Sequence, residues 1–166
     1  MIAEPRRAKT EPTPARLLIV EARYYEALAD ELLAGAQDAI RAAGAQAVVV
    51  TVSGALEVPV AVRMAVDAAA EAGAPFDGVV ALGSVIRGET SHYDIVAGES
   101  ARALMDFSVA RTLPIGNAIL TVDTEAQAWA RARRGEGDKG GFAANAVLEL
   151  VRIRRALPGI VAGVSA

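Results

Sequence analysis

The chain has 166 residues, which is enough for one domain with a substantial core, and it carries a net charge of −3. It contains no cysteine and a single histidine, so disulfides, thiolate chemistry and a histidine-rich zinc site within one chain are excluded. No basic stripe with interleaved aromatic residues is present, and we therefore expect no nucleic-acid partner.

The N-terminal residues lack the features of a targeting segment. Glu4, Arg6, Arg7 and Lys9 are not followed by an apolar run, unlike the charged start of a secretory signal. No uncharged stretch approaches the roughly 18 residues of a membrane-spanning helix. We expect a cytoplasmic protein that does not associate with membranes.

Short apolar runs of strand length alternate with stretches of helical periodicity along the chain. This alternation predicts an α/β protein with a parallel sheet and helices on both of its faces. The predicted strands cover 17–20, 47–52, 78–82 and 118–122, and the predicted helices follow the turns 21–25, 53–59 and 83–88, a cap at Asp123 or Thr124, and the glycine-rich turn 135–141.

Three regions are expected from composition. Residues 1–15 hold three prolines and mixed charge, and such an arm is expected to be loose alone or tied down on a neighbour. Residues 16–156 form a single domain. Residues 157–166 are an apolar, glycine-containing tail in which no clear element is predicted.

The stretch from Phe76 to Phe107 is expected to organise the rest of the molecule. Its pattern predicts a buried strand, a polar turn bounded by glycines, and a helix. Ser91 and Asp94 have the spacing of a capping box, which puts His92 in the first helical turn, at the C-terminal end of a strand. Open α/β sheets bind ligands at that end, and helix N-termini favour anions.

Several polar side chains have a chemical interpretation and a simpler alternative. His92 can transfer protons near neutral pH, or it can be a helix-start residue satisfied by the backbone. Thr90 and the N–H groups after Gly88 can hold a phosphate or only cap the helix. Arg131 can clamp an anion or be a solvated helix residue. Lys139 lies in a glycine-rich turn that lacks the spacing of a P-loop.

Three more residues narrow the chemistry. Glu57 stands among apolar residues and needs a partner, either the hydroxyls of a polyol or an arginine. Tyr24 can stack on a planar ring or pack at the rim of the core. Ser53 is not part of a G-x-S-x-G elbow, which argues against a hydrolase. By themselves these residues indicate an α/β protein that binds a small phosphorylated ligand.

Four segments together are more specific than any single residue. The central string at 83–94 is uncommon, and three further segments match in the same order. From about Arg16 to Arg155 the chain resembles lumazine synthase, the penultimate enzyme of riboflavin synthesis. The segments are SGALEVP at 53–59, GSVIRGETSHYD at 83–94, ILT at 119–121 with EAQA at 125–128 and RA at 131–132, and DKGG at 138–141.

The resemblance implies a transferase reaction. The family condenses 5-amino-6-(D-ribitylamino)uracil with 3,4-dihydroxy-2-butanone 4-phosphate to 6,7-dimethyl-8-ribityllumazine, and it releases phosphate and water. It implies that no metal or organic cofactor is needed. The partners it implies are the two small-molecule substrates, other copies of the chain and riboflavin synthase.

The resemblance also implies roles for single residues. His92 matches the proposed proton-transfer residue, and Arg131 matches the clamp on the leaving phosphate. Because most of the rate should come from holding two reactants together, we expect loss of His92 to slow the enzyme without abolishing its activity. The implied substrate contacts are Tyr24 on the pyrimidine, Ala55, Leu56 and Glu57 on the ribityl chain, Ser84, Val85 and Ile86 on the ring through their backbone, and Glu89, Thr90, Arg131 and Lys139 at the phosphate.

The fold implied by the resemblance is a flavodoxin-like three-layer αβα sandwich with strand order 2-1-3-4, assembled as a pentamer. Active sites lie between neighbouring subunits, and a neighbour's N-terminal segment extends the sheet, which gives residues 1–15 a function. Pentamers of the family stay single, pair into decamers or close into an icosahedral shell.

The chain departs from the family pattern at two places. Asn117 and the residue after it stand where many members have Phe-Gly, so Asn117 must contribute through its amide or its backbone. Gly135 stands where a lysine is common, and that turn carries extra charge in Arg133, Arg134 and Glu136.

Two other functions fit the same scaffold. One is a non-catalytic flavin or lumazine carrier, and the other is a shell-forming protein whose main role is encapsulation. The presence of His92, Arg131 and Lys139 argues against a pure carrier, which has no need of a phosphate-leaving site. A shell is compatible with catalysis.

Overall fold

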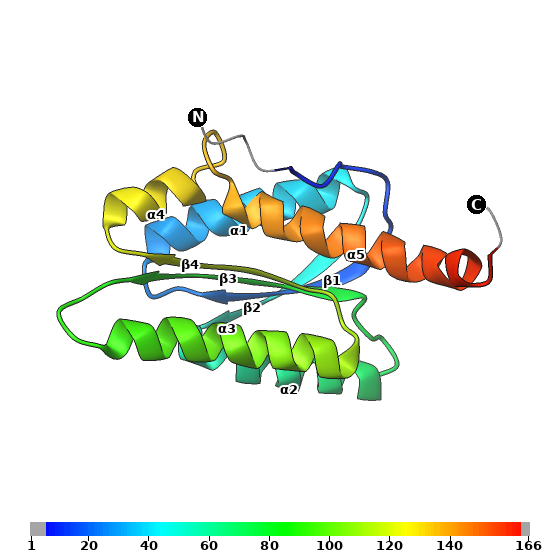
Figure 1. The fold of residues 1–166 in the computed structure, drawn as a ribbon, viewed down its shortest axis with the longest axis horizontal. Coiled ribbons are helices and arrows are strands. Elements are labelled where there is room, and N and C mark those ends of the chain that lie inside the picture. Colours follow the sequence, from blue (N-terminus) through cyan, green and yellow to red (C-terminus); the bar gives the residue numbers. More distant parts are fainter. Residues whose placement is uncertain (1–5, 164–166) are drawn as a thin grey trace.

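In the computed structural model, which describes residues 6–163, four strands form one parallel sheet in the order β2-β1-β3-β4 (Figure 1). The predicted fold class and strand order are therefore confirmed. The elements are β1 (Arg16–Ala22), α1 (Glu26–Ala42), β2 (Gln46–Val52), a 3₁₀ turn (Ala55–Glu57), α2 (Val58–Glu71), β3 (Gly78–Ile86), α3 (His92–Arg111), β4 (Ile115–Val122), α4 (Glu125–Ala132) and α5 (Lys139–Val161).

The molecule has three layers. Helices α1, α4 and α5 cover one face of the sheet, and α2 and α3 cover the other (Figure 1). Side chains of β1 alternate between the two cores: Leu17 and Ile19 pack on the α1/α5 side, and Leu18 and Val20 on the α2/α3 side. All four are fully buried, and each such side chain stabilises the fold by about 1.5–3 kcal/mol. This is the flavodoxin-like sandwich that the sequence indicated.

Strand β3 is longer than expected. The turn predicted at 83–88 is wrong, because the strand continues through Gly83 to Ile86. The reason is pairing: β3 lies between β1 and β4, and its register with β4 runs on to Ile86 opposite Val122. Glycine suits position 83 inside the strand because it has no side chain, whereas a Cβ there would lie only 3.2 Å from the Cβ of Ala22. The real turn therefore begins at Arg87, closer to α3.

The C-terminal tail is also more ordered than expected. Helix α5 continues to Val161, so the absence of an element predicted from 157 onward is wrong for 157–161. Pro158 removes one backbone donor near the end of the helix, but the preceding residues are good helix formers and the helix continues for about one more turn. Residues 164–166 lie outside the described part of the chain.

The described part of the N-terminal arm is held on its own chain. The Thr13 N–H donates to the Ala43 carbonyl at 2.8 Å, and the guanidinium of Arg152 on α5 donates to the Thr13 hydroxyl at 2.9 Å and to the Lys9 carbonyl at 3.2 Å. Thr13 is 1% exposed. The arm is therefore not loose over residues 9–15, whereas residues 1–5 lie outside the described range.

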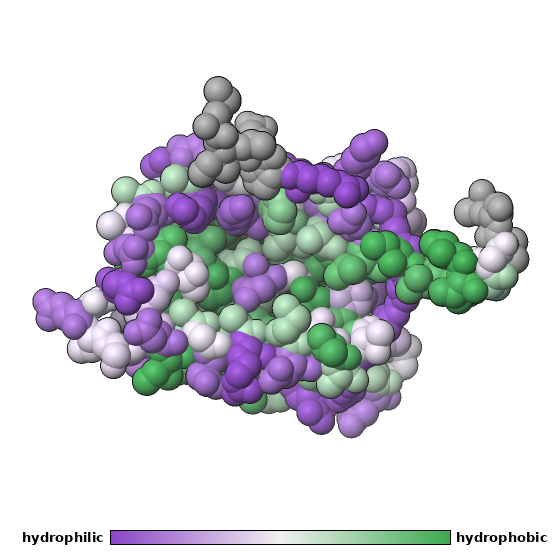
Figure 2. Space-filling model, viewed as in Figure 1, coloured by the Kyte–Doolittle hydropathy of each residue, from purple (hydrophilic) through white to green (hydrophobic). Residues whose placement is uncertain are grey.

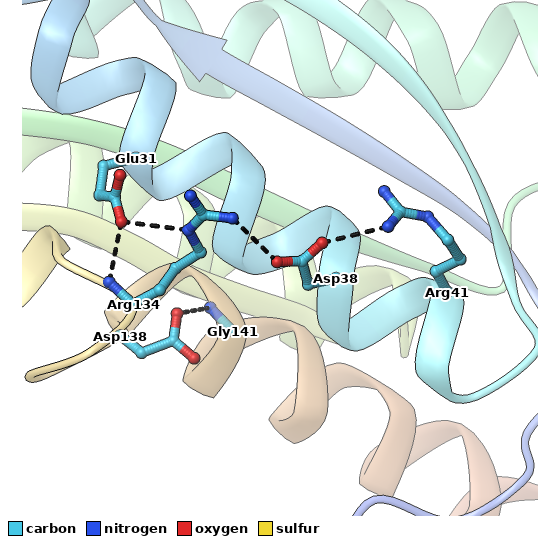
Figure 3. A network of polar contacts seen from close by, with 6 residues as sticks. All are labelled: Glu31, Asp38, Arg41, Arg134, Asp138 and Gly141. Carbon is cyan, nitrogen blue, oxygen red and sulfur yellow. Dashed lines mark hydrogen bonds and ion pairs between the residues drawn. The ribbon is translucent and has the colours of Figure 1, made fainter.

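A polar network fastens the turn between α4 and α5 to α1 (Figure 3). The Glu31 carboxylate accepts from the Arg134 backbone N–H at 3.0 Å and from its Nε at 3.1 Å. The same guanidinium donates to Asp38 at 3.1 Å, and Asp138 caps α5 by accepting from the Gly141 N–H at 3.2 Å. The extra charge noted in this turn thus has a structural use: it fixes the turn between Arg131 and Lys139.

Helices α1 and α5 approach closely because glycine forms the contact. A Cβ on Gly140 would lie 2.1 Å from the Leu32 carbonyl oxygen, which is a backbone atom that cannot yield easily. The sequence motif DKGG therefore has a packing role at its first glycine, beside the residues that resemble a phosphate site.

We expect Gly140→Ala to lower the free energy of unfolding by about 2–3 kcal/mol, because the new methyl group overlaps the α1 backbone. The matched control is Gly98→Ala in α3, where nothing lies within 4 Å of the new Cβ. That change should stabilise by about 0.5–1 kcal/mol. Denaturant unfolding followed by circular dichroism, at one fixed protein concentration, compares the two. Equal effects would contradict the packing argument.

We expect Glu31→Gln to weaken the protein at neutral pH but not in acid. Hydrogen bonds from Arg134 lower the pKa of Glu31 below its ordinary value. A lowered carboxyl pKa contributes stability above the unfolded-state pKa of about 4.3 and loses it as the pH falls through the folded value. The measurement is the melting temperature of wild type and variant from pH 7 down to about pH 3, where the two curves should converge.

The control for this pH series is Glu71→Gln, at the exposed end of α2. It should leave the melting temperature nearly unchanged at every pH. The contribution of Asp138 to stability changes with pH in the opposite direction to that of Glu31. Burial raises the pKa of Asp138, so its charged form reduces stability as the pH rises. A gap between wild type and Glu31→Gln that stays constant down to acid pH would show that the carboxylate charge is not the cause.

Candidate functional site

A hollow of about 500 Å³ opens at the C-terminal end of the sheet, on the side of α2 and α3. Four separate segments meet there: the loop after β1, the turn after β2, the end of β3 and the start of α3. This is the position at which open parallel sheets bind ligands. Its lining residues are Tyr24, Tyr25, Ser53, Gly54, Ala55, Leu56, Glu57, Ser84, Val85, Ile86, Gly88, Thr90, His92, Tyr93 and Val96.

The structure brings most of the predicted site residues into this hollow. Glu89 is not part of the lining, although Gly88 and Thr90 on either side of it are. The predicted residues that do line the hollow are Tyr24, Ala55, Leu56, Glu57, Ser84, Val85, Ile86, Thr90 and His92.

Tyr24 and Glu57 occupy the mouth of the hollow as available side chains. Tyr24 is 74% exposed and meets Tyr25 edge to face, with ring centroids 5.0 Å apart, so packing at the rim of the core is not its role. Glu57 is exposed, and no ion pair or hydrogen bond of its carboxylate occurs among residues 6–163. The arginine partner considered for Glu57 is therefore not found within that range.

The first turn of α3 differs from the predicted capping box. The Ser91 side chain makes no capping hydrogen bond, because its backbone is near helical (φ −70°, ψ 0°) rather than extended. The Asp94 N–H bonds to the Ser91 carbonyl at 3.0 Å, and the Thr90 hydroxyl accepts from the His92 N–H at 3.3 Å. The Thr90 hydroxyl thus satisfies one backbone N–H at the start of α3, while the side chain of His92 stays exposed at the hollow.

Arg87 holds the turn that carries His92. Its Nε donates to Asp123 at 2.8 Å, its Nη1 lies 3.7 Å from Asp94, and its guanidinium carbon sits 4.1 Å from the Tyr93 ring centre. The hydrogen bond to Asp123 raises the pKa of Arg87 above its ordinary value, so the side chain remains a cation. One guanidinium therefore fixes both residues that follow His92 in the helix.

Three predicted site residues do not line this hollow: Asn117, Arg131 and Lys139. They line a second hollow of about 310 Å³ along the exposed edge of β4, with contributions from α4 and α5. Figure 2 shows hydrophobic residues between the two helix layers on the face where β4 forms the edge of the sheet. Within one chain the structure therefore does not place Arg131 opposite Thr90 and His92. The two sets of residues belong to two different hollows.

Three polar side chains of the second hollow already make contacts within the chain. The Asn117 side-chain oxygen accepts from the Ile119 N–H at 2.9 Å. Arg131 donates from Nη1 to the Gln127 carbonyl at 3.0 Å, one turn back on α4. The Lys139 ammonium lies 4.9 Å from the Phe142 ring centre. Two cations on adjacent helices at an apolar edge make this hollow suited to an anion.

Residue-by-residue reasoning missed part of the lining. Two of the missed residues could have been found from the sequence, because Tyr93 lies inside the 83–94 string and Tyr25 directly follows Tyr24. Val96 lies one helical turn after His92 and Tyr93, a spacing that puts it on the same face. Ser53 and Gly54 belong to the SGALEVP motif. These missed residues are Tyr25, Ser53, Gly54, Gly88, Tyr93 and Val96.

Two classes of site are not found in the described range. Within residues 6–163, no group of three or more His, Cys, Asp or Glu side chains is arranged to hold a metal ion. In the same range, no helix is both long enough and apolar enough to cross a bilayer.

Comparison with known proteins gives one consistent result. A sequence model of the 6,7-dimethyl-8-ribityllumazine synthase family matches residues 14–155. The proteins of that name from Azorhizobium caulinodans and Xanthobacter autotrophicus are 66% and 65% identical over 143 residues, covering 86% of this chain and 88% and 87% of their own lengths. A relative from Methylobacterium radiotolerans is 60% identical over 160 residues, covering 92% of this chain and 94% of its own.

The matched region contains both hollows and every site residue predicted from the sequence. It spans most of the chain, and the identities are far above the level at which only a fold is shared. On the sequence motifs, the fold and these comparisons, the chain belongs to the 6,7-dimethyl-8-ribityllumazine synthase family.

Proposed function

We propose that this chain is a riboflavin-biosynthesis transferase that condenses 5-amino-6-(D-ribitylamino)uracil with 3,4-dihydroxy-2-butanone 4-phosphate. The observation that supports it best is the hollow at the C-terminal end of the sheet, where Tyr24, Glu57, Thr90 and His92 converge from three separate segments. Each supplies chemistry that one part of these substrates requires. No metal or organic cofactor takes part in the proposal.

The pyrimidine substrate fits the apolar and carboxylate end of the hollow. The exposed Tyr24 ring offers a face for stacking on the heterocycle. The backbone of Ser84, Val85 and Ile86 offers hydrogen bonds to the ring edge at the end of β3. Glu57 has acceptor oxygens for the hydroxyls of the ribityl chain.

The phosphorylated substrate fits the other end, at the start of α3. The reaction begins with attack of an amine on a ketone and proceeds through loss of phosphate, so it needs proton transfers and an anion site. His92 in the first helical turn transfers protons, and the positive end of the helix dipole beside Thr90 favours the phosphate. Glu89 is assigned to the phosphate end by family resemblance.

We propose that the second hollow completes the site from a neighbouring subunit. Arg131 and Lys139 cannot act on the leaving phosphate beside His92 of the same chain, because the two hollows are separate. A homopentamer would bring the β4 edge of one subunit against the first hollow of the next. Asn117 would then contribute to the interface through its backbone and the remaining capacity of its amide.

Exposed apolar side chains support such an assembly. Val60 and Met64 on α2 and Met105 and Val109 on α3 are 62–72% exposed, and a neighbouring subunit would cover these apolar side chains. On the β2 edge of the sheet, away from β4, Val48 and Val49 are 40% and 36% exposed. This edge suits an added strand from the part of a neighbour's N-terminal arm that precedes residue 9, because residues 9–15 are held on their own chain.

Three finer assignments complete the proposal. The protein acts in the cytoplasm, where both substrates are made available by metabolism. Residues 16–156 hold the synthase domain, flanked by the arm and by residues 157–166. Riboflavin synthase is the partner that would consume the product.

The test is a mixture of purified protein with both substrates, followed by lumazine fluorescence and phosphate release. We expect His92→Ala to lower the turnover number about 10²-fold without abolishing it. Arg131→Ala should lower kcat/KM for the phosphorylated substrate by a similar factor, roughly 10², mainly through KM. Arg102→Ala, on the exposed face of α3, is the control and should leave both constants unchanged.

One outcome would count against the synthase, and another would count only against the role of His92. A wild-type rate no greater than the uncatalysed background, together with tight binding of lumazine or flavin, would favour the carrier. An unchanged single-turnover rate in His92→Ala would remove His92 from proton transfer.

Mixing the two variants tests the shared site. If His92 and Arg131 come from different subunits, refolding equal amounts of His92→Ala and Arg131→Ala together should restore about a quarter of the wild-type sites, because random neighbours pair an intact His92 with an intact Arg131 at that frequency. Light scattering on the same samples gives the size of the assembly. If both residues act within one chain, the mixture will show only the average of the two variants.

A further inference from the structure

Glu21 is a buried charged residue to which the proposed function assigns no role. Among residues 6–163 it is the one charged side chain that is buried, at 3% exposed. It follows the alternation of β1, so it points to the α1 side of the sheet and not into the substrate hollow. A carboxylate in such a place destabilises the fold unless its charge is compensated by partners.

The compensation comes from two donors that converge on one oxygen. Oε1 of Glu21 accepts from Arg23 Nε at 2.9 Å and from the Thr51 hydroxyl at 2.9 Å. Oε2 is buried and has no hydrogen-bond partner within the described residues. The unpaired buried oxygen lowers the stability of the fold. An apolar side chain would fill the same position in the β1 core without it, so packing alone does not explain a glutamate here.

The partner, Arg23, is restrained at three places by this arrangement. Its backbone N–H donates to the Val52 carbonyl at 3.0 Å, its Nε meets Glu21, and its Nη2 meets Asp30 on α1 at 2.5 Å. The hydrogen bond to Asp30 raises the pKa of Arg23, so the guanidinium stays charged. Strand β1, strand β2 and helix α1 are thus joined through one residue, by its backbone to β2 and by its side chain to β1 and α1.

The residue after Arg23 is Tyr24, whose ring has little other support. It is 74% exposed, and its recorded aromatic contact is the edge-to-face meeting with Tyr25. The direction of the ring therefore depends on the backbone of the loop, and that backbone is set by Arg23 immediately before it. The buried carboxylate is the fixed point from which this loop is held.

We propose that Glu21 is a positioning residue for recognition of the pyrimidine substrate: through Arg23 it holds the 23–25 loop so that Tyr24 presents its ring to the hollow. The inference rests on the proposed function and adds a specificity role for a side chain on the far face of the sheet. Glu21 touches no substrate, and its effect is confined to the substrate that Tyr24 binds.

The test is a double-mutant cycle between Glu21→Gln and Tyr24→Ala. Gln keeps the shape but not the charge, so Arg23 loses the buried one of its two anionic partners and keeps only the exposed Asp30. We expect Glu21→Gln to raise KM for the pyrimidine about tenfold, while kcat and KM for the phosphorylated substrate change less than about twofold. In the Tyr24→Ala background the same substitution should add less than about twofold.

Two further variants keep the test independent of folding. Arg23→Lys retains the charge but lacks the rigid fork through which Nε and Nη2 reach Glu21 and Asp30 from separate nitrogens, so it should raise the same KM if Glu21→Gln fails to fold. Ile40→Val, buried at the other end of α1, is the control for general destabilisation and should leave both KM values unchanged.

The outcomes separate this inference from the proposed function. Failure of the wild-type protein to form product would overturn the proposed function, whereas an active wild type with an unchanged pyrimidine KM in Glu21→Gln and Arg23→Lys would overturn the positioning role alone. Additive effects of Glu21→Gln and Tyr24→Ala, or equal losses for both substrates, would also overturn it.

Discussion

The pairing of β3 with both of its neighbours is the constraint on which the site depends. Eight residues of β3 are in register with β4, from Val79 opposite Ile115 to Ile86 opposite Val122. This pairing keeps the backbone extended past Gly83, so Ser84–Ile86 reach the substrate hollow as strand and not as loop. It also sets the point at which the chain must turn, and α3 therefore begins with His92 at the mouth of that hollow.

Much of this arrangement follows from the sequence because it depends on local pattern. Buried strands such as 17–20 are continuous apolar runs, and their alternation with helices fixes the parallel sheet. The motif residues around His92 and Glu57 converge because the C-terminal ends of parallel strands share one edge. The family resemblance supplied the roles of these residues, which periodicity alone left open.

The features that were missed depend on contacts between segments distant in sequence. The end of β3 is set by β4, some 36 residues further on, so its own glycine suggested a turn that the partner strand prevents. Ser91 and Asp94 have capping spacing, but the Asp94 carboxylate lies 3.7 Å from Arg87, and the Thr90 hydroxyl accepts from the His92 N–H. The separation of Arg131 from His92 also depends on how distant segments pack, because α4 and α3 lie on opposite faces of the sheet.

The edge of β4 shows how one amide affects the whole sheet. By accepting from the Ile119 N–H, the Asn117 side chain occupies a donor that an incoming strand would need. No side chain among residues 6–163 accepts from a backbone N–H of β2, and Val48 and Val49 on that strand are exposed. The two borders of the sheet therefore differ: a strand added beside β4 would find the Ile119 donor already taken by the side chain of Asn117.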